Sequence, residues 1–121
     1  MSTILVVDDK ADITNLVKMI FEPKGDNVLS ASNGKEAVER LQGASVDVVL
    51  MDLMMPEMNG YEALRAIRAD ERTRSLKVIA CTARASKQDE SQVMDAGFDG
   101  YIAKPFRVKA LEEEVKKYLA S

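Results

Sequence analysis

The chain has 121 residues, of which 46% are hydrophobic and 31% charged, values typical of a globular domain that folds in water. A net charge of −3 argues against a broad surface for nucleic acids or membranes, because both need a basic face. The sequence contains no histidine, which excludes Ser-His and Cys-His catalysis and histidine zinc sites within the chain.

The apolar runs are too short to cross a membrane, since none approaches the ~18 residues of a spanning helix. Met1-Ser2-Thr3 leads directly into the first apolar run, so we expect no signal peptide. The lone Cys81 cannot form an internal disulfide, and its apolar neighbours predict a small buried hydrophobic residue. These features predict one domain over residues 1–121 in the reducing cytoplasm.

The first predicted elements are a strand over residues 4–7, a helix and a second strand over Asn27–Ala31. Asp12 is the expected helix cap, and Pro23 and Gly25 end that helix. The apolar positions of the helix recur at a spacing that places them on one face: Ile13, Leu16, Val17, Ile20 and Phe21.

Three further strands and four further helices follow by the same criteria. Asn33 and Glu36 have the spacing of a capping box before a helix that Gly43 ends. The later strands are expected at residues 46–51, 77–81 and 101–103. A helix begins at Gly60, another runs over residues 87–96, and the last runs from Val108 to Tyr118 or Leu119. The helix over 87–96 is unusually polar; we expect Ser86 to cap it and Gly97 to end it in the left-handed conformation.

Strict alternation of strands and helices predicts an α/β fold with a parallel sheet covered on both faces. In such folds ligands bind beyond the carboxyl ends of the strands. Polar residues follow four of the five predicted strands at that end: Asp8, Asp9, Asp52, Thr82 and Lys104. The pattern therefore predicts a site built from three carboxylates, one hydroxyl and one ammonium.

Those groups suit phosphoryl chemistry that depends on a divalent metal. Clustered carboxylates repel one another, so a hard cation such as Mg²⁺ is their natural occupant. Asp52 has the chemistry of a nucleophile that forms an acyl-phosphate. Lys104 and Thr82 are suited to bind the other phosphoryl oxygens.

The same residues carry a resemblance to the receiver domains of two-component response regulators, in the layout of the single-domain chemotaxis type. The matching motifs extend over essentially the whole chain: Asp8-Asp9, MDLMMPEMNG at residues 51–60, Thr82-Ala83, GFDGY at residues 97–101, and Lys104-Pro105-Phe106. The resemblance implies a flavodoxin-like doubly wound (βα)5 sandwich of three layers, with strand order 2-1-3-4-5. It also implies a switch protein rather than an enzyme.

The resemblance implies a role for each site residue. Asp52 would accept the phosphoryl group. Asp9, Asp52 and the backbone carbonyl of Met54 would ligate Mg²⁺ directly, and Asp8 would act largely through water. Thr82 and Lys104 would contact the phosphoryl group.

The switch and its partners are implied in the same way. Tyr101 would swing inward as Thr82 moves toward the phosphate, and Lys104-Pro105 would be a cis peptide. The signalling face would comprise the fourth helix, fifth strand and fifth helix, including Arg84, Lys87, Tyr101 and Arg107. The phosphoryl donor would be a sensor histidine kinase or a histidine phosphotransfer protein, or a small acyl-phosphate, and the face would bind an effector protein or domain. We expect a monomer or weak dimer, with no direct contact with nucleic acid or membrane.

Three alternatives stay open at this point. A phosphohydrolase of the haloacid dehalogenase kind is disfavoured because it needs an acid two residues after the nucleophile, where Met54 stands. A pseudo-receiver is disfavoured by the presence of every expected acid. A fragment of a DNA-binding regulator is disfavoured because no effector segment follows Ser121 and Asp99-Gly100 replaces the acidic pair of many dimerising members. Some residues also have simpler interpretations: Tyr101 as sheet packing, and Met51, Met54, Met55 and Met58 as loop and core packing.

Overall fold

The computed structural model describes residues 2–55, 58–83, 87–104 and 106–119, and of Lys87 the backbone alone. Five strands form one parallel sheet in the order β2-β1-β3-β4-β5, which is the flavodoxin-like order expected from the sequence. The strands are β1 (Thr3–Val7), β2 (Asn27–Ala31), β3 (Val48–Asp52), β4 (Lys77–Thr82) and β5 (Gly100–Ala103). The helices are α1 (Ala11–Phe21), the short 3₁₀ helix η1 (Glu22–Lys24), α2 (Gly34–Gly43), α3 (Gly60–Ala69), α4 (Lys87–Asp95) and α5 (Val108–Lys116).

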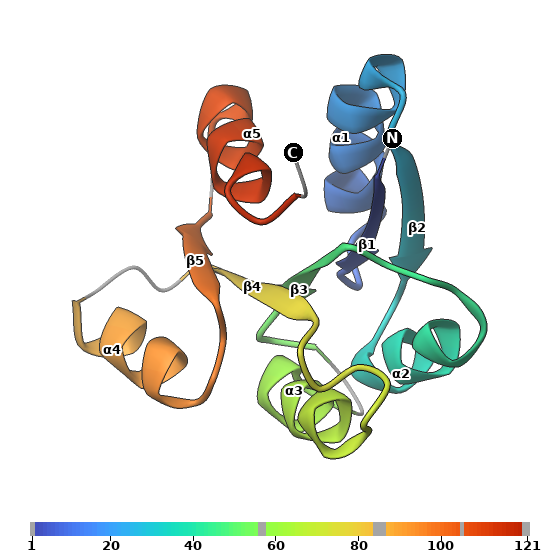
Figure 1. Cartoon of the computed structure of the whole chain (residues 1–121). Helices are drawn as coiled ribbons and strands as arrows, with labels where there is room; N and C mark the ends of the chain where they lie inside the picture. Colours follow the sequence, from blue (N-terminus) through green and yellow to red (C-terminus); the bar gives the residue numbers. More distant parts are fainter. Residues whose placement is uncertain (1, 56–57, 84–86, 105, 120–121) are drawn as a thin grey trace.

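The helices cover both faces of the sheet and make the molecule three layers thick. Helices α1 and α5 lie on one face, and α2, α3 and α4 lie on the other (Figure 1). Successive strand side chains point to opposite faces, so β1 contributes Ile4 and Val6 to the core under α1 and α5. Leu5 and Val7 enter the core under α2 and α3. The uninterrupted apolar runs are thus explained by burial on both sides.

The central strand β3 has the least access to solvent. All five of its residues are buried, and it pairs with β1 on one side and β4 on the other. Asp52 is its last residue, so an acidic side chain stands at the end of the most enclosed strand.

The helix ends agree with the sequence in part. The Asn33 side chain accepts a hydrogen bond from the Glu36 amide at 2.8 Å, as its capping position predicts. Gly25 and Gly97 have φ angles of 93° and 109°, the left-handed conformation in which glycine is favoured. Asp12 is not the cap of α1, because the helix begins at Ala11 and the N-cap position is occupied by Lys10, whose side chain makes no capping bond.

Asp12 lies instead in the first turn of α1, where a negative charge is stabilised by the helix dipole. Helix α5 ends at Lys116, before the predicted Tyr118 or Leu119, since a turn follows. Ser86, the predicted cap of α4, lies outside the described residues. Among the helices of the described chain, none is both long and apolar enough to cross a membrane.

Candidate functional site

The carboxyl ends of four strands bring the predicted site residues to one edge of the sheet. Asp8 and Asp9 follow β1, and Asp52 ends β3. Thr82 ends β4, and Lys104 follows β5 directly. The parallel pairing of these strands puts all five residues at the same edge, as the alternating pattern predicted.

The three carboxylates form one cluster. Asp8, Asp9 and Asp52 each offer an oxygen, and these oxygens all lie within 4.8 Å of one another. Asp8 and Asp52 are only 4% and 5% exposed, whereas Asp9 is open to solvent. Two buried carboxylates so close together are costly unless a cation compensates them.

Lys104 supplies part of that compensation. Its ammonium Nζ lies 2.6 Å from Asp8 Oδ2 and 3.6 Å from Asp52 Oδ1, and 13% of its side chain is exposed. Burial by itself lowers the pKa of Lys104, but the hydrogen bond to Asp8 and the charges of Asp52 and Asp8 raise the pKa overall. The lysine therefore stays protonated between the two buried acids.

Asp52 nevertheless has an unfavourable environment for its charge. Burial raises its pKa most, and the neighbouring charge of Asp8 raises it further. Lys104 and a hydrogen bond from the Met54 amide to Asp52 Oδ1, 3.2 Å long, oppose the rise without cancelling it. The positive charge of Lys104 therefore does not balance the negative charge of the three carboxylates. A further cation would compensate the remaining charge.

The donor set suits Mg²⁺. Hard divalent cations prefer carboxylate and carbonyl oxygens, and Mg²⁺ uses one or two protein carboxylates while it keeps several waters. A pocket of about 210 Å³ opens beside Asp8 and Asp9 and gives water access to the cluster. Its other lining residues are mostly small and polar: Ala11, Thr14, Asn15, Ser30, Ala31 and Ser32. Sequence reasoning did not anticipate this polar wall.

The turn after Asp52 is fixed by the start of α3. The Gly60 amide donates to the Leu53 carbonyl at 3.2 Å, and Asn59 and Glu62 form a reciprocal capping box. A Cβ added to Gly60 would lie 2.6 Å from the Asp52 carbonyl oxygen. The backbone of α3 therefore touches the backbone of Asp52. The Asn59-x-x-Glu62 spacing is itself a capping signal in the sequence, and the prediction of this helix from Gly60 overlooked it.

A second pocket lies between Thr82 and α4. It has a volume of about 100 Å³ and is lined by Leu53, Met54, Tyr61, Thr82, Asp89, Gln92 and Val93. Tyr101 is partly buried near the same helix, and its pKa is raised by burial and then by the negative charges of Asp89 and Glu90. The two predicted switch residues thus both lie against α4.

Three of the four methionines near the site are at least partly buried. Met51 and Met55 are buried and Met58 is partly buried, as expected for core packing, whereas Met54 is 66% exposed beside the site. Cys81 is buried, and burial raises the pKa of its thiol to about 12. Arg84, Pro105 and hence the proposed cis peptide lie outside the described residues.

This arrangement agrees with what the comparisons with known proteins found. The family model of the response regulator receiver domain matches residues 4–116. The chain belongs to the response regulator receiver family. Receiver domains are signal-transduction switches of two-component systems rather than classical enzymes.

The related receivers include proteins of two sizes. The chemotaxis protein CheY of Pseudomonas aeruginosa is 36% identical over 115 residues, which cover 94% of this chain and 93% of that protein. The transcriptional regulatory protein CpxR of Escherichia coli K12 is 38% identical over 119 residues, which cover 98% of this chain. The chain spans only 50% of CpxR.

Solved receiver structures share the fold closely. CheY4 of Vibrio cholerae aligns with a TM-score of 0.92 and 28% identity over 98% of this chain and 99% of its own. The receiver domain of the sensor histidine kinase PA1611 from Pseudomonas aeruginosa PAO1 aligns with a TM-score of 0.89 and 32% identity, over 99% and 98% of the two chains. That structure holds a magnesium ion coordinated in its active-site cleft.

Proposed function

We propose that this receiver accepts a phosphoryl group on Asp52 in a reaction that depends on Mg²⁺. The observation that carries the proposal is the position of Asp52, which ends the buried strand β3 between two other acids and the ammonium of Lys104. The magnesium-bound active-site cleft of the related PA1611 receiver supports the choice of metal.

The reaction transfers a phosphoryl group to a carboxylate. An oxygen of Asp52 forms a bond to phosphorus while the bond between phosphorus and the donor breaks, and the donor leaves with the bonding electrons. Mg²⁺, held by Asp9, Asp52 and the Met54 carbonyl with Asp8 acting through water, would supply positive charge to the phosphoryl oxygens. Phosphoryl transfer of this kind needs mainly positioning and charge stabilisation.

The chain's own residues perform the positioning. The Met54 amide holds one oxygen of Asp52, which orients the carboxylate. Lys104 is close enough to Asp52, at 3.6 Å, to bind an oxygen of a phosphoryl group attached there. Thr82 faces the pocket next to α4, and its hydroxyl would bind a second oxygen and draw the β4 end toward the phosphate. Tyr101 would then turn inward and report the change at the surface.

The donor and the target are proteins in this proposal. Because the chain has no histidine, a phosphohistidine must come from a sensor kinase or a phosphotransfer protein. The face made by α4, β5 and α5 would bind an effector protein or domain. Residues 1–121 would act as one receiver unit in the cytoplasm, as a monomer or weak dimer.

The first experiment is intact-mass spectrometry after incubation with acetyl phosphate, with and without Mg²⁺. We expect one phosphoryl adduct that requires Mg²⁺ and is missing in Asp52→Asn. The exposed Asp12→Asn is the matched control and should phosphorylate normally. An adduct of unchanged yield in Asp52→Asn would contradict the proposal. If acetyl phosphate gives no adduct, a phosphohistidine donor decides the question.

A second variant tests the role of the lysine. Lys104→Ala keeps the three carboxylates, so it should still bind Mg²⁺, but phosphorylation should no longer change the environment of α4. NMR chemical shifts of the α4 amides before and after phosphorylation provide the measurement. If phosphorylation changes these chemical shifts as much in Lys104→Ala as in the wild type, Lys104 does not couple phosphorylation to α4.

A further inference from the structure

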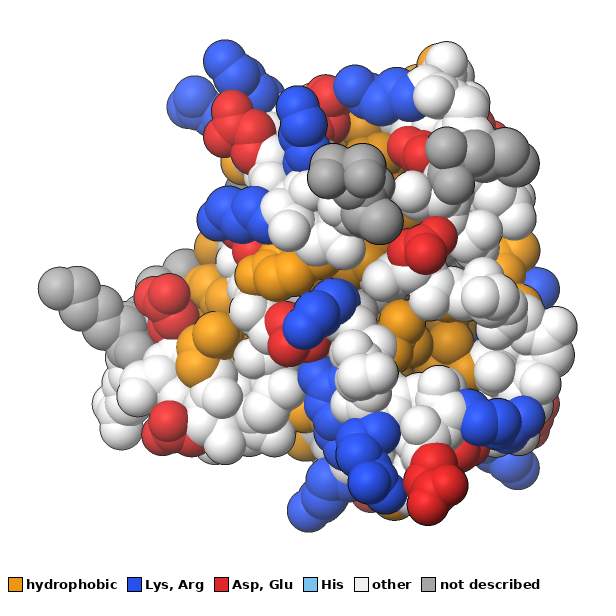
Figure 2. All heavy atoms as spheres, in the orientation of Figure 1, with side chains coloured by type: hydrophobic (Ala, Val, Ile, Leu, Met, Phe, Trp, Pro, Cys, Tyr) orange, Lys and Arg blue, Asp and Glu red, His pale blue; other side chains and the backbone are white. Residues whose placement is uncertain are grey.

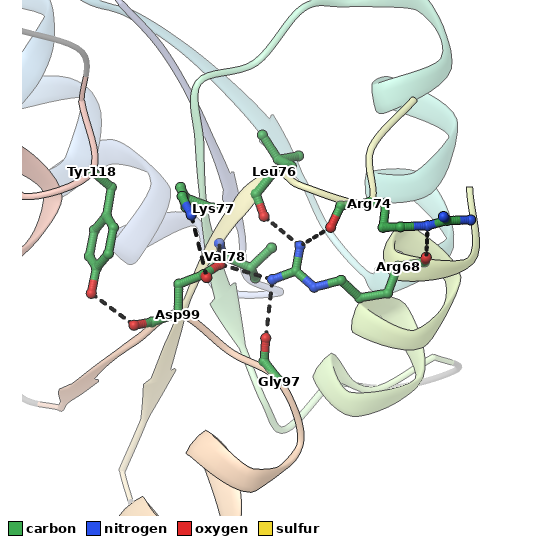
Figure 3. A network of polar contacts seen from close by, with 8 residues as sticks. All are labelled: Arg68, Arg74, Leu76, Lys77, Val78, Gly97, Asp99 and Tyr118. Atoms are coloured by element: carbon green, nitrogen blue, oxygen red, sulfur yellow. Dashed lines mark hydrogen bonds and ion pairs between the residues drawn. The ribbon is translucent and has the colours of Figure 1, made fainter. Parts of the chain in front are cut away.

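A second polar network lies at the amino edge of the sheet, opposite the candidate site, and is centred on Arg68 of α3 (Figure 3). Arg68 Nη1 donates to the carbonyls of Arg74 and Leu76 at 2.9 and 2.5 Å. Its Nη2 donates to the Gly97 carbonyl at 3.1 Å and to Asp99 Oδ2 at 2.8 Å. One guanidinium therefore connects α3, the loop before β4 and the loop between α4 and β5.

Asp99 connects the loop between α4 and β5 to β4 by hydrogen bonds. Its Oδ2 accepts a hydrogen bond from the Val78 amide at 2.8 Å, and its own amide donates to the Val78 carbonyl at 2.8 Å. Tyr118, which follows α5, donates its hydroxyl to the Asp99 carbonyl at 2.8 Å. Lys77 Nζ lies 3.9 Å from the other carboxylate oxygen. Figure 2 shows basic side chains gathered over α3 and the start of β4 on this face.

The loop between α4 and β5 is also held by packing. Phe98 is 3% exposed and meets the ring of Tyr61 edge to face, with centroids 5.8 Å apart. Gly100 packs closely against α5 and the residue after it, because a Cβ would lie 2.7 Å from Glu114 Oε2 and 2.8 Å from the Tyr118 hydroxyl. Residues 97–100, which we name the α4 anchor, thus contact α3, β4 and α5 at once.

Helix α4 itself is weakly held in comparison. Among the side chains of α4 that the structure describes, Val93 alone is buried. Met94 is 43% exposed, and the other side chains described, Asp89 excepted, are open to solvent. Little apolar burial therefore holds the described part of α4, and elements with little apolar burial move at low cost.

We propose that the α4 anchor is the fixed end of α4, that Arg68 is the positioning residue that fixes it, and that the switch motion is a swing of the amino-terminal end. The proposal of a swing rests on the proposed phosphoacceptor function. The amino-terminal end lies on the side of the site, since α4 begins at Lys87, shortly after β4 ends at Thr82. The carboxyl-terminal end leads into the anchored loop.

The geometry then predicts where an effector senses the switch. A helix of nine residues is ~13.5 Å long, so a rotation about its carboxyl-terminal end displaces the first turn most and the last turn least. An effector that senses this swing must contact the amino-terminal half of α4. An effector that contacts only the last turn would bind both states with similar affinity, so it would not shift the equilibrium between them.

The test is amide hydrogen exchange followed by NMR, on wild type and Arg68→Gln, with and without phosphorylation by acetyl phosphate and Mg²⁺. The amides of Gly97 and Asp99 report the anchor, because they donate backbone hydrogen bonds to the Met94 and Val78 carbonyls. In wild type, phosphorylation should change exchange in residues 88–91 while the anchor amides stay within about twofold. In Arg68→Gln the anchor amides should exchange about tenfold faster before phosphorylation, and phosphorylation should then change them as well.

Controls separate the anchor from general stability. Arg65→Gln removes an exposed arginine from the same helix and should leave anchor exchange unchanged. Arg68→Lys keeps the charge next to Asp99 but cannot reach all four acceptors, so it should give an intermediate rate. If Arg68→Gln fails to fold, Asp99→Asn replaces it, because the asparagine oxygen can still accept from Val78 while the charge is lost.

Two results would overturn the inference. One is anchor exchange in Arg68→Gln equal to that in Arg65→Gln. The other is a wild-type anchor that responds to phosphorylation as strongly as residues 88–91 do. Absence of any phosphoryl adduct would count against the proposed function alone, since exchange in unphosphorylated Arg68→Gln tests the fixed end without it.

Discussion

Folding disfavours the charge of Asp52, the proposed phosphoacceptor. Burial and the charge of Asp8 raise its pKa above the ordinary value of 3.8, so the ionised form is less favourable in the folded chain than in the unfolded chain. At pH values between the unfolded-state pKa and the folded-state pKa of Asp52, the folded state therefore binds more protons than the unfolded state. Stability falls as the pH rises through this window, and the full penalty remains at neutral pH.

Asp52→Asn should consequently stabilise the metal-free protein at pH 7, because the neutral amide removes a charge that folding disfavours. The gain should shrink as the pH falls toward 4, because wild-type Asp52 then becomes protonated. Urea denaturation in the presence of a chelator, repeated at pH 7 and pH 5, measures both effects. A variant less stable than wild type at pH 7 would show that the charge of Asp52 is compensated without metal.

Cys81 makes a second prediction for a single residue. Its thiol is buried and has a pKa of about 12, so almost no reactive thiolate exists at neutral pH. Iodoacetamide at pH 8 should leave the folded protein unmodified and alkylate it fully in concentrated urea. Mass spectrometry counts the adducts, and rapid alkylation of the folded protein would contradict the burial of this side chain.

At the scale of elements, the close contact between β3 and α3 fixes the position of the Asp52 backbone. A Cβ on Gly60 would meet the Asp52 carbonyl at 2.6 Å and the Leu53 Cα at 2.9 Å. Both neighbours are backbone atoms, so neither can move aside as a flexible side chain would. The absence of a side chain at Gly60 therefore allows α3 to pack directly against the end of β3.

Gly60→Ala should therefore destabilise the protein by about 1–3 kcal/mol, the usual cost of overpacking. It should also slow phosphorylation, since the turn after Asp52 must shift. Gly43→Ala is the matched control in α2, where a Cβ would meet nothing within 4 Å. That change should be neutral or stabilising by up to ~1 kcal/mol. Equal denaturation midpoints for the two variants would refute the close contact at Gly60.

Much of the fold and of the candidate site can be predicted from the sequence, but some contacts between elements cannot. The strands and their order follow from local patterns and from the family resemblance, and parallel pairing then places Asp8, Asp52 and Lys104 at one edge. Asp12 was placed wrongly because an acidic residue is favourable both at the N-cap and in the first turn. The contact of Arg68 with Asp99 joins residues 31 positions apart, and no periodic or capping signal connects them.

At the scale of the whole molecule, two charged clusters of the described residues lie at opposite edges of the sheet. At the amino edge, Arg68 and Lys77 pair with Asp99. At the carboxyl edge, three carboxylates lie together, and Lys104 pairs with Asp8 and Asp52. A divalent cation bound to the folded state alone should therefore stabilise the entire fold.

Mg²⁺ at 100 times its dissociation constant should add ~2.7 kcal/mol to the free energy of unfolding. Chelation should reverse the gain, and Asp9→Asn should diminish it, because one carboxylate of the cluster is lost. Thermal denaturation with and without Mg²⁺ measures the difference, with Asp12→Asn as the control. A Tm unchanged by Mg²⁺ in wild type would argue against a metal site at this edge.

The pairing of Lys104 with Asp8 has one more consequence. In the metal-free chain the ammonium is the counter-ion of the cluster, at 2.6 Å from Asp8. A bound Mg²⁺ would then compete with this ammonium for the negative charge of the cluster, and this competition would weaken its net affinity. Lys104→Ala should accordingly bind Mg²⁺ more tightly than wild type. In the native chain the same competition would release the lysine for the incoming phosphoryl group, so that loading the metal prepares the ligand for the next step.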